Sequence, residues 1–229
     1  MDFARFLQIY IIQGAFALFF LYMAYLVLKR GRKKLNLYLS CFYISTTIGG
    51  IINIIYANIF ENSIVYILHV LTYFLFCFSI GFLLVFTIIL IKPEREITFK
   101  TQFLILIIYG ILILGHLLIL NGITINLSTN WKPHWSWIFF VYSIIICSIA
   151  ILTTSYYSIK IFRKFENGYL KKKWKYFLIG LFAYFFLYYG TAFSNTLHSD
   201  LFRFIWSIIS LPTLTSVFLI YYGVGRQLE

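Results

Sequence analysis

Seven long apolar segments are the feature of this chain that most limits its possible folds. They cover approximately residues 6–28, 36–60, 64–91, 102–121, 136–159, 176–197 and 200–224. A helix needs about 20 residues, at 1.5 Å each, to cross the roughly 30 Å apolar core of a bilayer. Every segment reaches that length. We therefore predict an all-α polytopic membrane protein, in which residues 1–229 form a single bundle of seven transmembrane helices.

Composition supports a membrane protein over a soluble one. Hydrophobic residues make up 62% of the chain and charged residues 11%, against about 45–50% and about 25% in soluble domains. The net charge of +12 raises the possibility of a nucleic-acid partner. However, the basic residues form short clusters between apolar segments, which is typical of loops that face a cytoplasmic leaflet. We expect the lipid bilayer as partner, no nucleic acid, and the inner (cytoplasmic) membrane of a bacterium or archaeon.

The distribution of basic residues predicts the orientation of the bundle. Sixteen of the 19 lysines and arginines flank the first, third and fifth connections or follow the last helix, and only Arg5, Lys132 and Arg203 lie on the other side. Cytoplasmic loops carry such an excess, so we expect the N-terminus outside and the C-terminus in the cytoplasm. Four lysines of the fifth connection are expected to contact anionic lipid head groups: Lys171, Lys172, Lys173 and Lys175.

Tryptophans lie close to the predicted helix ends. Trp131, Trp135 and Trp137 surround the outer start of the fifth helix, and Trp174 lies at the inner start of the sixth. Tryptophan favours the interface between membrane and water, so we expect these residues there. The alternative for the Trp131–Trp137 cluster is a lid over a ligand.

Charged residues are missing from the deep part of every segment. Ion-coupled transporters and proton pumps usually need such residues. The last segment, 200–224, has no lysine, so a retinal Schiff base cannot form there. The three cysteines lie in apolar segments without metal-binding spacing, and we expect them to be buried as small hydrophobic residues.

The histidines are the residues best suited to metal or acid–base chemistry. His69 and His116 lie at similar depths below the predicted outer surface, His198 ends the sixth helix, and His134 is in an outer loop. Imidazole ligates zinc or haem, so His69, His116 and His198 are candidate ligands. No paired-histidine motif accompanies them, and the last helix lacks the histidine pair of the seven-helix zinc hydrolases. We expect no metal, no cofactor and no catalytic residue.

Polar residues inside the segments suggest a binding pocket. Asn53, His69 and His116 are the candidate ligand-binding residues of a small polar pocket, open to the outside and formed by the second, third, fourth and sixth helices. The alternative is that such side chains, and others such as Gln13 and Asn195, form hydrogen bonds between helices. Pro212 is expected to kink the last helix.

Three stretches carry a resemblance to a known family: Trp131–Tyr142, Lys171–Gly180 and Leu211–Gly223. They resemble the outer loop and fifth helix, the basic entry to the sixth helix, and the proline-bearing last helix of the N-terminal seven-helix sensor region of bacterial histidine kinases and diguanylate cyclases. Members of that family carry a kinase or cyclase domain after the last helix, whereas five residues, 225–229, follow it here. The resemblance implies a free-standing receptor module or part of a longer sensor.

Together these patterns predict a function in signal transduction. We expect a sensor or receptor-like module that recognises a small or lipidic ligand from the outer half and signals to a cytoplasmic protein. Three alternatives stay open. They are an uncoupled transporter or facilitator, a membrane enzyme or haem protein that uses the outer histidines, and a structural subunit of a membrane complex.

Overall fold

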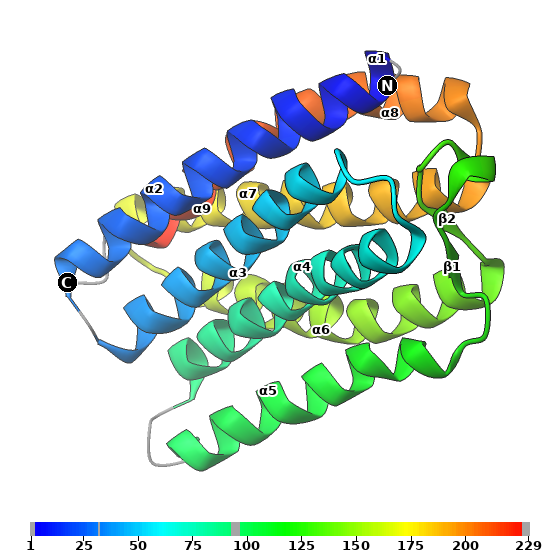
Figure 1. Ribbon diagram of the computed structural model, residues 1–229. Helices are drawn as coiled ribbons and strands as arrows, with labels where there is room; N and C mark the ends of the chain where they lie inside the picture. The colour runs from blue at the N-terminus through cyan, green and yellow to red at the C-terminus, as the bar shows by residue number, and fades with distance from the viewer. Residues whose placement is uncertain (1–2, 32, 93–96, 226–229) are drawn as a thin grey trace.

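Seven helices long and apolar enough to cross a membrane form one bundle (Figure 1). The computed structural model describes residues 3–31, 33–92 and 97–225. The spans are Leu7–Arg30, Lys34–Tyr56, Asn62–Ile91, Phe99–Leu118, Trp137–Lys164, Gly168–Leu197 and Asp200–Val224. The prediction of an all-α, seven-helix membrane protein is confirmed, and the protein is an integral polytopic membrane protein.

The spans are assembled from regular and irregular helical pieces. In chain order these are α1 (Phe3–Phe6), the π-helical η1 (Leu7–Gln13), α2 (Gly14–Arg30), α3 (Lys34–Tyr56), α4 (Asn62–Ile91), α5 (Phe99–Leu114), the 3₁₀ turn η2 (Gly115–Leu118), α6 (Trp137–Lys164), α7 (Gly168–Leu197), α8 (Asp200–Ser210), the 3₁₀ turn η4 (Leu211–Leu214), α9 (Thr215–Ile220) and the π-helical η5 (Tyr221–Gly225). Between η2 and α6, strands β1 (Ile123–Thr124) and β2 (His134–Trp135) pair antiparallel around the short 3₁₀ turn η3 (Leu127–Thr129).

Several helix ends differ from their predicted positions. The second span ends at Tyr56 instead of residue 60, where the Asn58 amide donates to the carbonyl of Ile54 (3.0 Å) and satisfies an end of the helix. The fifth span continues to Lys164, and the sixth already begins at Gly168 after an Asn167 cap. Charged residues can continue a helix beyond the apolar core into water, so hydrophobicity alone places the ends of the fifth and sixth spans too close to the membrane centre.

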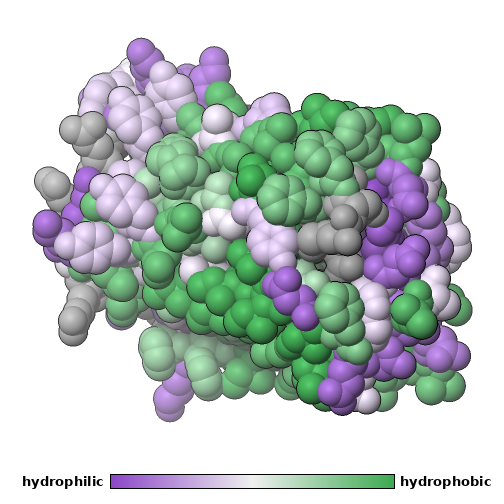
Figure 2. All heavy atoms as spheres, turned by 45° about the horizontal axis from the view of Figure 1, so that its top comes forward, coloured by the Kyte–Doolittle hydropathy of each residue, from purple (hydrophilic) through white to green (hydrophobic). Residues whose placement is uncertain are grey.

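The two ends of the bundle are different. One end, called the basic end below, carries Lys29, Lys34, Lys92, Lys164 and Lys171, and the last described helix ends there. The opposite end, called the hairpin end, carries residues 119–136 and the first described helix (Figure 1). Figure 2 shows a largely hydrophobic surface between hydrophilic groups at the two ends. Many large apolar side chains are exposed there, which suits contact with lipid acyl chains.

The last span is irregular at Pro212. Proline has no N–H group, and its ring collides with the carbonyl four residues earlier in an α-helix. Accordingly, α8 gives way at Leu211–Leu214 to the 3₁₀ turn before α9 begins. Side-chain hydroxyls satisfy carbonyls around the break: Ser210 Oγ donates to Ser207 O (3.0 Å) and Thr215 Oγ1 to Pro212 O (2.7 Å).

Candidate ligand cavity at the hairpin end

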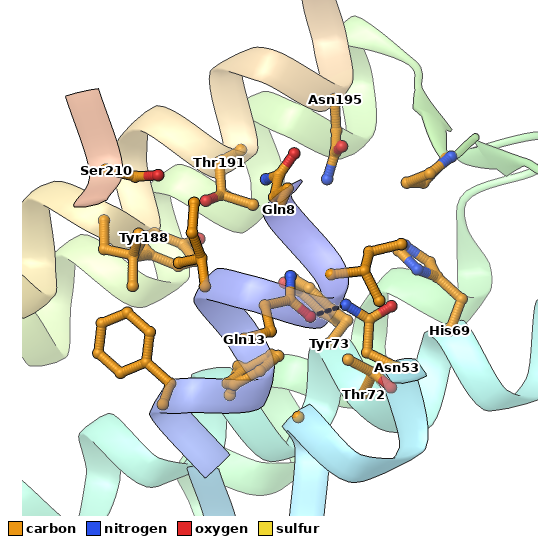
Figure 3. Close-up of a pocket in the computed structure, with 18 of the residues that line it drawn as sticks. Gln8, Gln13, Asn53, His69, Thr72, Tyr73, Tyr188, Thr191, Asn195 and Ser210 are labelled. Carbon is orange, nitrogen blue, oxygen red and sulfur yellow. Dashed lines mark hydrogen bonds between the residues drawn. The ribbon is translucent and has the colours of Figure 1, made fainter. Parts of the chain in front are cut away.

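A cavity of about 380 Å³ lies inside the hairpin half of the bundle (Figure 3). Its walls come from η1, α2, α3, α4, α7 and α8, and the β-hairpin region covers its end. Exposed Asp200 belongs to the lining, so the cavity reaches the surface beside α8. The polar side chains of the lining are Gln8, Gln13, Thr46, Asn53, Tyr56, His69, Thr72, Tyr73, Lys132, Tyr184, Tyr188, Thr191, Asn195, Asp200, Arg203 and Ser210.

Two amides meet in the middle of the cavity wall. Asn53 Nδ2 donates to Gln13 Oε1, and Figure 3 shows the two side chains facing each other from η1 and α3. Asn53 is 6% exposed, and its Oδ1 atom has no hydrogen-bond partner among the described residues. Thr72, which is 4% exposed, likewise has an unpartnered Oγ1. Buried polar atoms without partners are uncommon because each costs desolvation free energy, so this wall is suited to a ligand.

An irregular first helix places four residues in the cavity. The segment Leu7–Gln13 is π-helical, and Gln8, Ile9, Ile12 and Gln13 all line the space. A π-helical turn contains one more residue than an α-helical turn, and such turns occur frequently at functional sites. The irregularity therefore brings two glutamine side chains of one short segment to the same cavity.

His69 joins the cavity wall to the hairpin. The indole Nε1 of Trp135 donates to His69 Nε2 (3.2 Å), and the Tyr56 hydroxyl contacts His69 Nδ1 (2.9 Å). An indole N–H can only donate, so His69 Nε2 is the unprotonated nitrogen. Neutral His69 then carries its proton on Nδ1 and donates it to Tyr56. Both ring nitrogens are engaged, and the ring fixes Trp135 over the cavity.

Three further contacts hold the hairpin to the end of α7 and the start of the last span. Lys132 Nζ lies 2.6 Å from Asp200 Oδ1, Arg203 Nη2 donates to Pro133 O (2.8 Å), and His198 Nε2 donates to Trp135 O (3.2 Å). A loop covering a cavity is usually mobile, because its backbone contacts are few. Here the segment 132–135 is attached to α4, to α8 and to the α7–α8 connection.

His134 and His198 stack at the rim, with ring centroids 4.1 Å apart and planes inclined by 10°. Partial burial, together with the nearby His198, Arg203 and Lys132, lowers the pKa of His134 to about 4, while Asp200 opposes them. His134 is therefore neutral at pH 7. A charge on its ring would be placed among three other cationic or basic groups.

The far wall connects three helices. The Tyr73 hydroxyl of α4 donates to Ser143 Oγ of α6 (2.9 Å), and Ser143 Oγ lies 2.7 Å from the Tyr188 hydroxyl of α7. Tyr73 and Tyr188 line the cavity, whereas Ser143 lies behind them and is completely buried. This chain of hydroxyls fixes both tyrosine rings and hence the width of the cavity.

The floor of the cavity is a tyrosine on an aromatic layer. The Tyr184 hydroxyl lies 2.8 Å from Ser79 Oγ and 3.3 Å from Thr46 Oγ1. On the side of the basic end, the Tyr184 ring packs against Phe42 (centroids 5.1 Å apart) and Phe20 (6.1 Å). Phe20, Phe42 and Tyr43 are completely buried. They close the cavity toward the basic end.

Two of the three predicted binding residues line this cavity. Asn53 and His69 do, whereas His116 does not, and none of the described lining residues belongs to α5 or η2. The chain ends its fourth span in a 3₁₀ turn, in which His116 Nδ1 donates to Ile113 O (2.6 Å) and the ring packs on Phe139. The first and last spans contribute instead of the fourth, which corrects the predicted set of helices.

The predicted metal ligands do not come together. No group of three or more histidine, cysteine or acidic side chains able to hold a metal occurs within residues 3–31, 33–92 and 97–225. His69 uses both nitrogens in hydrogen bonds, His198 Nε2 is bonded to Trp135 O, and His116 lies on the α6 side of Tyr73. These contacts give the histidines roles in packing and in loop attachment.

Three aromatic or basic residues occupy positions other than those expected. Trp135 and Trp174 are buried between helices (4% and 5% exposed) and do not face lipid, and their indole N–H groups donate to His69 and to Ser158 O. Lys173 is buried as well, with Nζ 3.2 Å from the centroid of the Tyr222 ring, so it does not face lipid. Lys171, Lys172 and Lys175 are exposed at the basic end.

Comparison of the chain with models of protein families, with curated proteins and with solved structures finds no match in any of the three.

Proposed function

We propose that the protein is a membrane receptor module that binds a small molecule in the hairpin-end cavity and signals to a cytoplasmic partner through its basic end. The observation that carries the proposal is the shape of the cavity, which reaches the surface at one end and stops at an aromatic layer at the other. Its volume of about 380 Å³ falls within the range of roughly 300–1,000 Å³ typical of ligand sites.

The closed floor favours a receptor over a transporter or facilitator. A solute pathway needs a polar route to the other side, whereas the residues below Tyr184 are the completely buried Phe20, Phe42 and Tyr43. Tyr184 bonds to α3 and α4 through its hydroxyl and packs on α2 through its ring. A ligand that displaces Tyr184 would therefore shift three helices relative to α7, which is a route by which binding reaches the basic end.

The orientation expected from the basic residues and the resemblance to bacterial sensor regions support this proposal. The excess of lysine and arginine at the basic end supports a cytoplasmic position for it. The stretches Trp131–Tyr142 and Lys171–Gly180 resemble the sensor regions of bacterial histidine kinases and diguanylate cyclases. A bacterial or archaeal cytoplasmic membrane and a cytoplasmic signalling protein as partner follow from that resemblance and form part of the proposal.

Binding and signalling are tested together in lipid nanodiscs. A panel of small neutral, anionic and cationic amphiphiles is screened by thermal unfolding, and hydrogen exchange is then measured with the compounds that stabilise the protein. We expect at least one compound to raise the Tm of the wild type and to change exchange in the segments at the basic end. Leu187→Trp fills the cavity and should abolish both effects, whereas Ile179→Trp, on the exposed surface of the same helix, should retain them.

Uptake into proteoliposomes separates the two classes of function. Saturable uptake of a stabilising compound that is lost in Leu187→Trp would indicate a facilitator instead of a receptor. Binding without any change in exchange at the basic end would also contradict signalling through the bundle.

A further inference from the structure

The amides of Gln13 and Asn53 limit the chemistry of the ligand. Their mutual hydrogen bond uses one amide donor and one amide acceptor. Asn53 Oδ1 then remains as an acceptor without a partner, and Gln13 Nε2 remains as a donor in the cavity lining. The assignment of oxygen and nitrogen in an amide rests on hydrogen bonding. If both amides were flipped together, the pair would still present one donor and one acceptor.

Charge in the lining is confined to the rim. Lys132, Asp200 and Arg203 are its charged members among the described residues, and all three lie at the hairpin end. The deeper lining consists of uncharged amide, hydroxyl, aromatic and aliphatic side chains. A charged group placed there would lose its hydration without gaining an opposite charge, which is costly in a low-dielectric interior. The deep part of the ligand must therefore be neutral.

Apolar contacts complete the description of the ligand. Phe16, Ala17, Ile80 and Leu187 line the space around the amide pair and above Tyr184. The volume of about 380 Å³ lies near the lower end of the roughly 300–1,000 Å³ range of ligand sites, which suits a small ligand.

We infer that the cavity binds a small, uncharged amphiphile whose head group carries both a hydrogen-bond donor and an acceptor, as a carboxamide does. The head group pairs with Gln13 and Asn53, and its donor satisfies Asn53 Oδ1. The Thr72 hydroxyl, also without a partner, lies in the same lining and provides a second hydrogen-bonding position. The alkyl part occupies the space between Phe16 and Leu187. This inference rests on the proposed function, because it names the ligand of the same cavity.

Three probes of the same shape test the head group. Octanamide has a donor and an acceptor, 2-nonanone replaces the amide NH₂ by a methyl group and keeps the acceptor, and octanoate is anionic at pH 7.5. Binding is measured by calorimetry on the full chain in nanodiscs, with empty nanodiscs subtracted. Octanamide should bind about tenfold or more tightly than either analogue, because an unsatisfied buried acceptor costs the equivalent of a factor of ten.

Variants connect the preference to the amide pair. Gln13→Leu combined with Asn53→Leu should bring octanamide to the affinity of 2-nonanone. Asn58→Leu, in the turn that follows α3 and outside the cavity lining, should leave the preference unchanged. If the double leucine variant does not fold, the exchange of the two residues, Gln13→Asn with Asn53→Gln, serves instead. It keeps one donor and one acceptor and should retain the preference.

Each outcome decides the inference. Equal or tighter binding of 2-nonanone or octanoate, or a preference that survives the double leucine variant, would overturn the amide-type ligand. The receptor function would stand if other compounds of the panel still bound in a manner sensitive to Leu187→Trp. The absence of octanamide binding to the wild type would also overturn the inference, whereas only the absence of every panel compound would remove the proposed function as well.

Discussion

The hairpin half and the basic half of this bundle are built from the same helices but are packed differently. The hairpin half contains a cavity with unpartnered polar atoms and a folded loop held by hydrogen bonds. The basic half is filled by side chains such as Leu39, Phe86 and Phe177, which are completely buried. The difference teaches that stability and recognition are divided along the membrane normal: the solid basic half holds the helices together, so the hollow hairpin half can keep an open space lined by polar groups.

The largest expected effect concerns which half of the bundle faces the cytoplasm. We expect an impermeant maleimide to label Ser128→Cys on intact cells and Glu166→Cys only after the cells are opened, because the excess of basic residues places the Glu166 end in the cytoplasm. Both positions are exposed at opposite ends. The unmodified chain controls for its own cysteines, of which Cys77 and Cys147 are buried. The reverse labelling pattern would invert the comparison.

The attachment of the hairpin should be the most sensitive contact of the hollow half. Trp135→Ala removes a buried indole and leaves His69 Nε2 without its donor, so we expect a loss of about 3–5 kcal/mol in stability. Hydrogen exchange should increase in residues 119–136 before it increases at the basic end. Trp137→Ala is the control, because Trp137 is 57% exposed. An equal increase in hydrogen exchange throughout the bundle would show that the two halves do not open independently.

The solid half should respond to an added methyl group. A Cβ atom at Gly180 would lie 2.8 Å from Ser216 O and from Ile220 N, so α7 and α9 could not keep their separation. We expect Gly180→Ala to cost about 1–3 kcal/mol through overpacking, measured as a lower Tm. Gly168→Ala is the control, since nothing lies within 4 Å of the added atom. An unchanged Tm would mean that the basic half is less tightly packed than described.

The boundary between the halves should tolerate a small change. Tyr184→Phe removes the hydroxyl that lies near Ser79 and Thr46, but both of those side chains keep a bond to a backbone carbonyl. We expect a loss of about 0.6–1 kcal/mol in unfolding free energy. The ligand-induced change in hydrogen exchange at the basic end should decrease by a larger fraction than the free energy of unfolding. Tyr156→Phe, at an exposed tyrosine, should change neither quantity.

The smallest effect is expected from pH at the rim. The pKa of His134 is about 4 in the folded protein and about 6.5 when unfolded. Between these values the unfolded chain binds a proton that the folded chain does not, so stability should fall as pH decreases from 7 toward 4. His134→Gln should reduce that slope in thermal unfolding. Because His134 is partly exposed, the difference will be modest, and an unchanged slope would assign the acid sensitivity to other groups.

The helices could be predicted from the sequence, but their inward faces could not. In a membrane both lipid and protein interior are apolar, so hydrophobic periodicity does not identify the buried side of a helix. Asn53 and His69 were identifiable because polar side chains avoid lipid. Gln13 carried the same signal, but its π-helical segment has no recognisable sequence pattern. The position of His116 depends on the 3₁₀ turn that ends its span, which hydrophobicity does not encode.

Trp135 is the clearest example of missing information. Its sequence context, near a helix start and beside other tryptophans, is the one typical of an interfacial residue. Its burial results from pairing of β1 with β2, which places Ile123 opposite Trp135, and from the acceptor nitrogen of His69 on a distant helix. Neither contact is local. A lid formed by this region stood among the alternatives for the cluster, and the cavity lining includes Trp135.

The π-helical segment Leu7–Gln13 lets two glutamines share the cavity at an unusual spacing. Gln8 and Gln13 are five residues apart, a spacing that would place their side chains about 140° apart on an α-helix. A π turn amounts to an α-helix with one inserted residue. Loss of the exposed Ile11 would shorten the spacing to four residues and let the segment return to α-helical winding, with the two side chains about 40° apart. Both glutamines would still face the cavity, so a single codon can be lost at this point of the gene without loss of the binding surface.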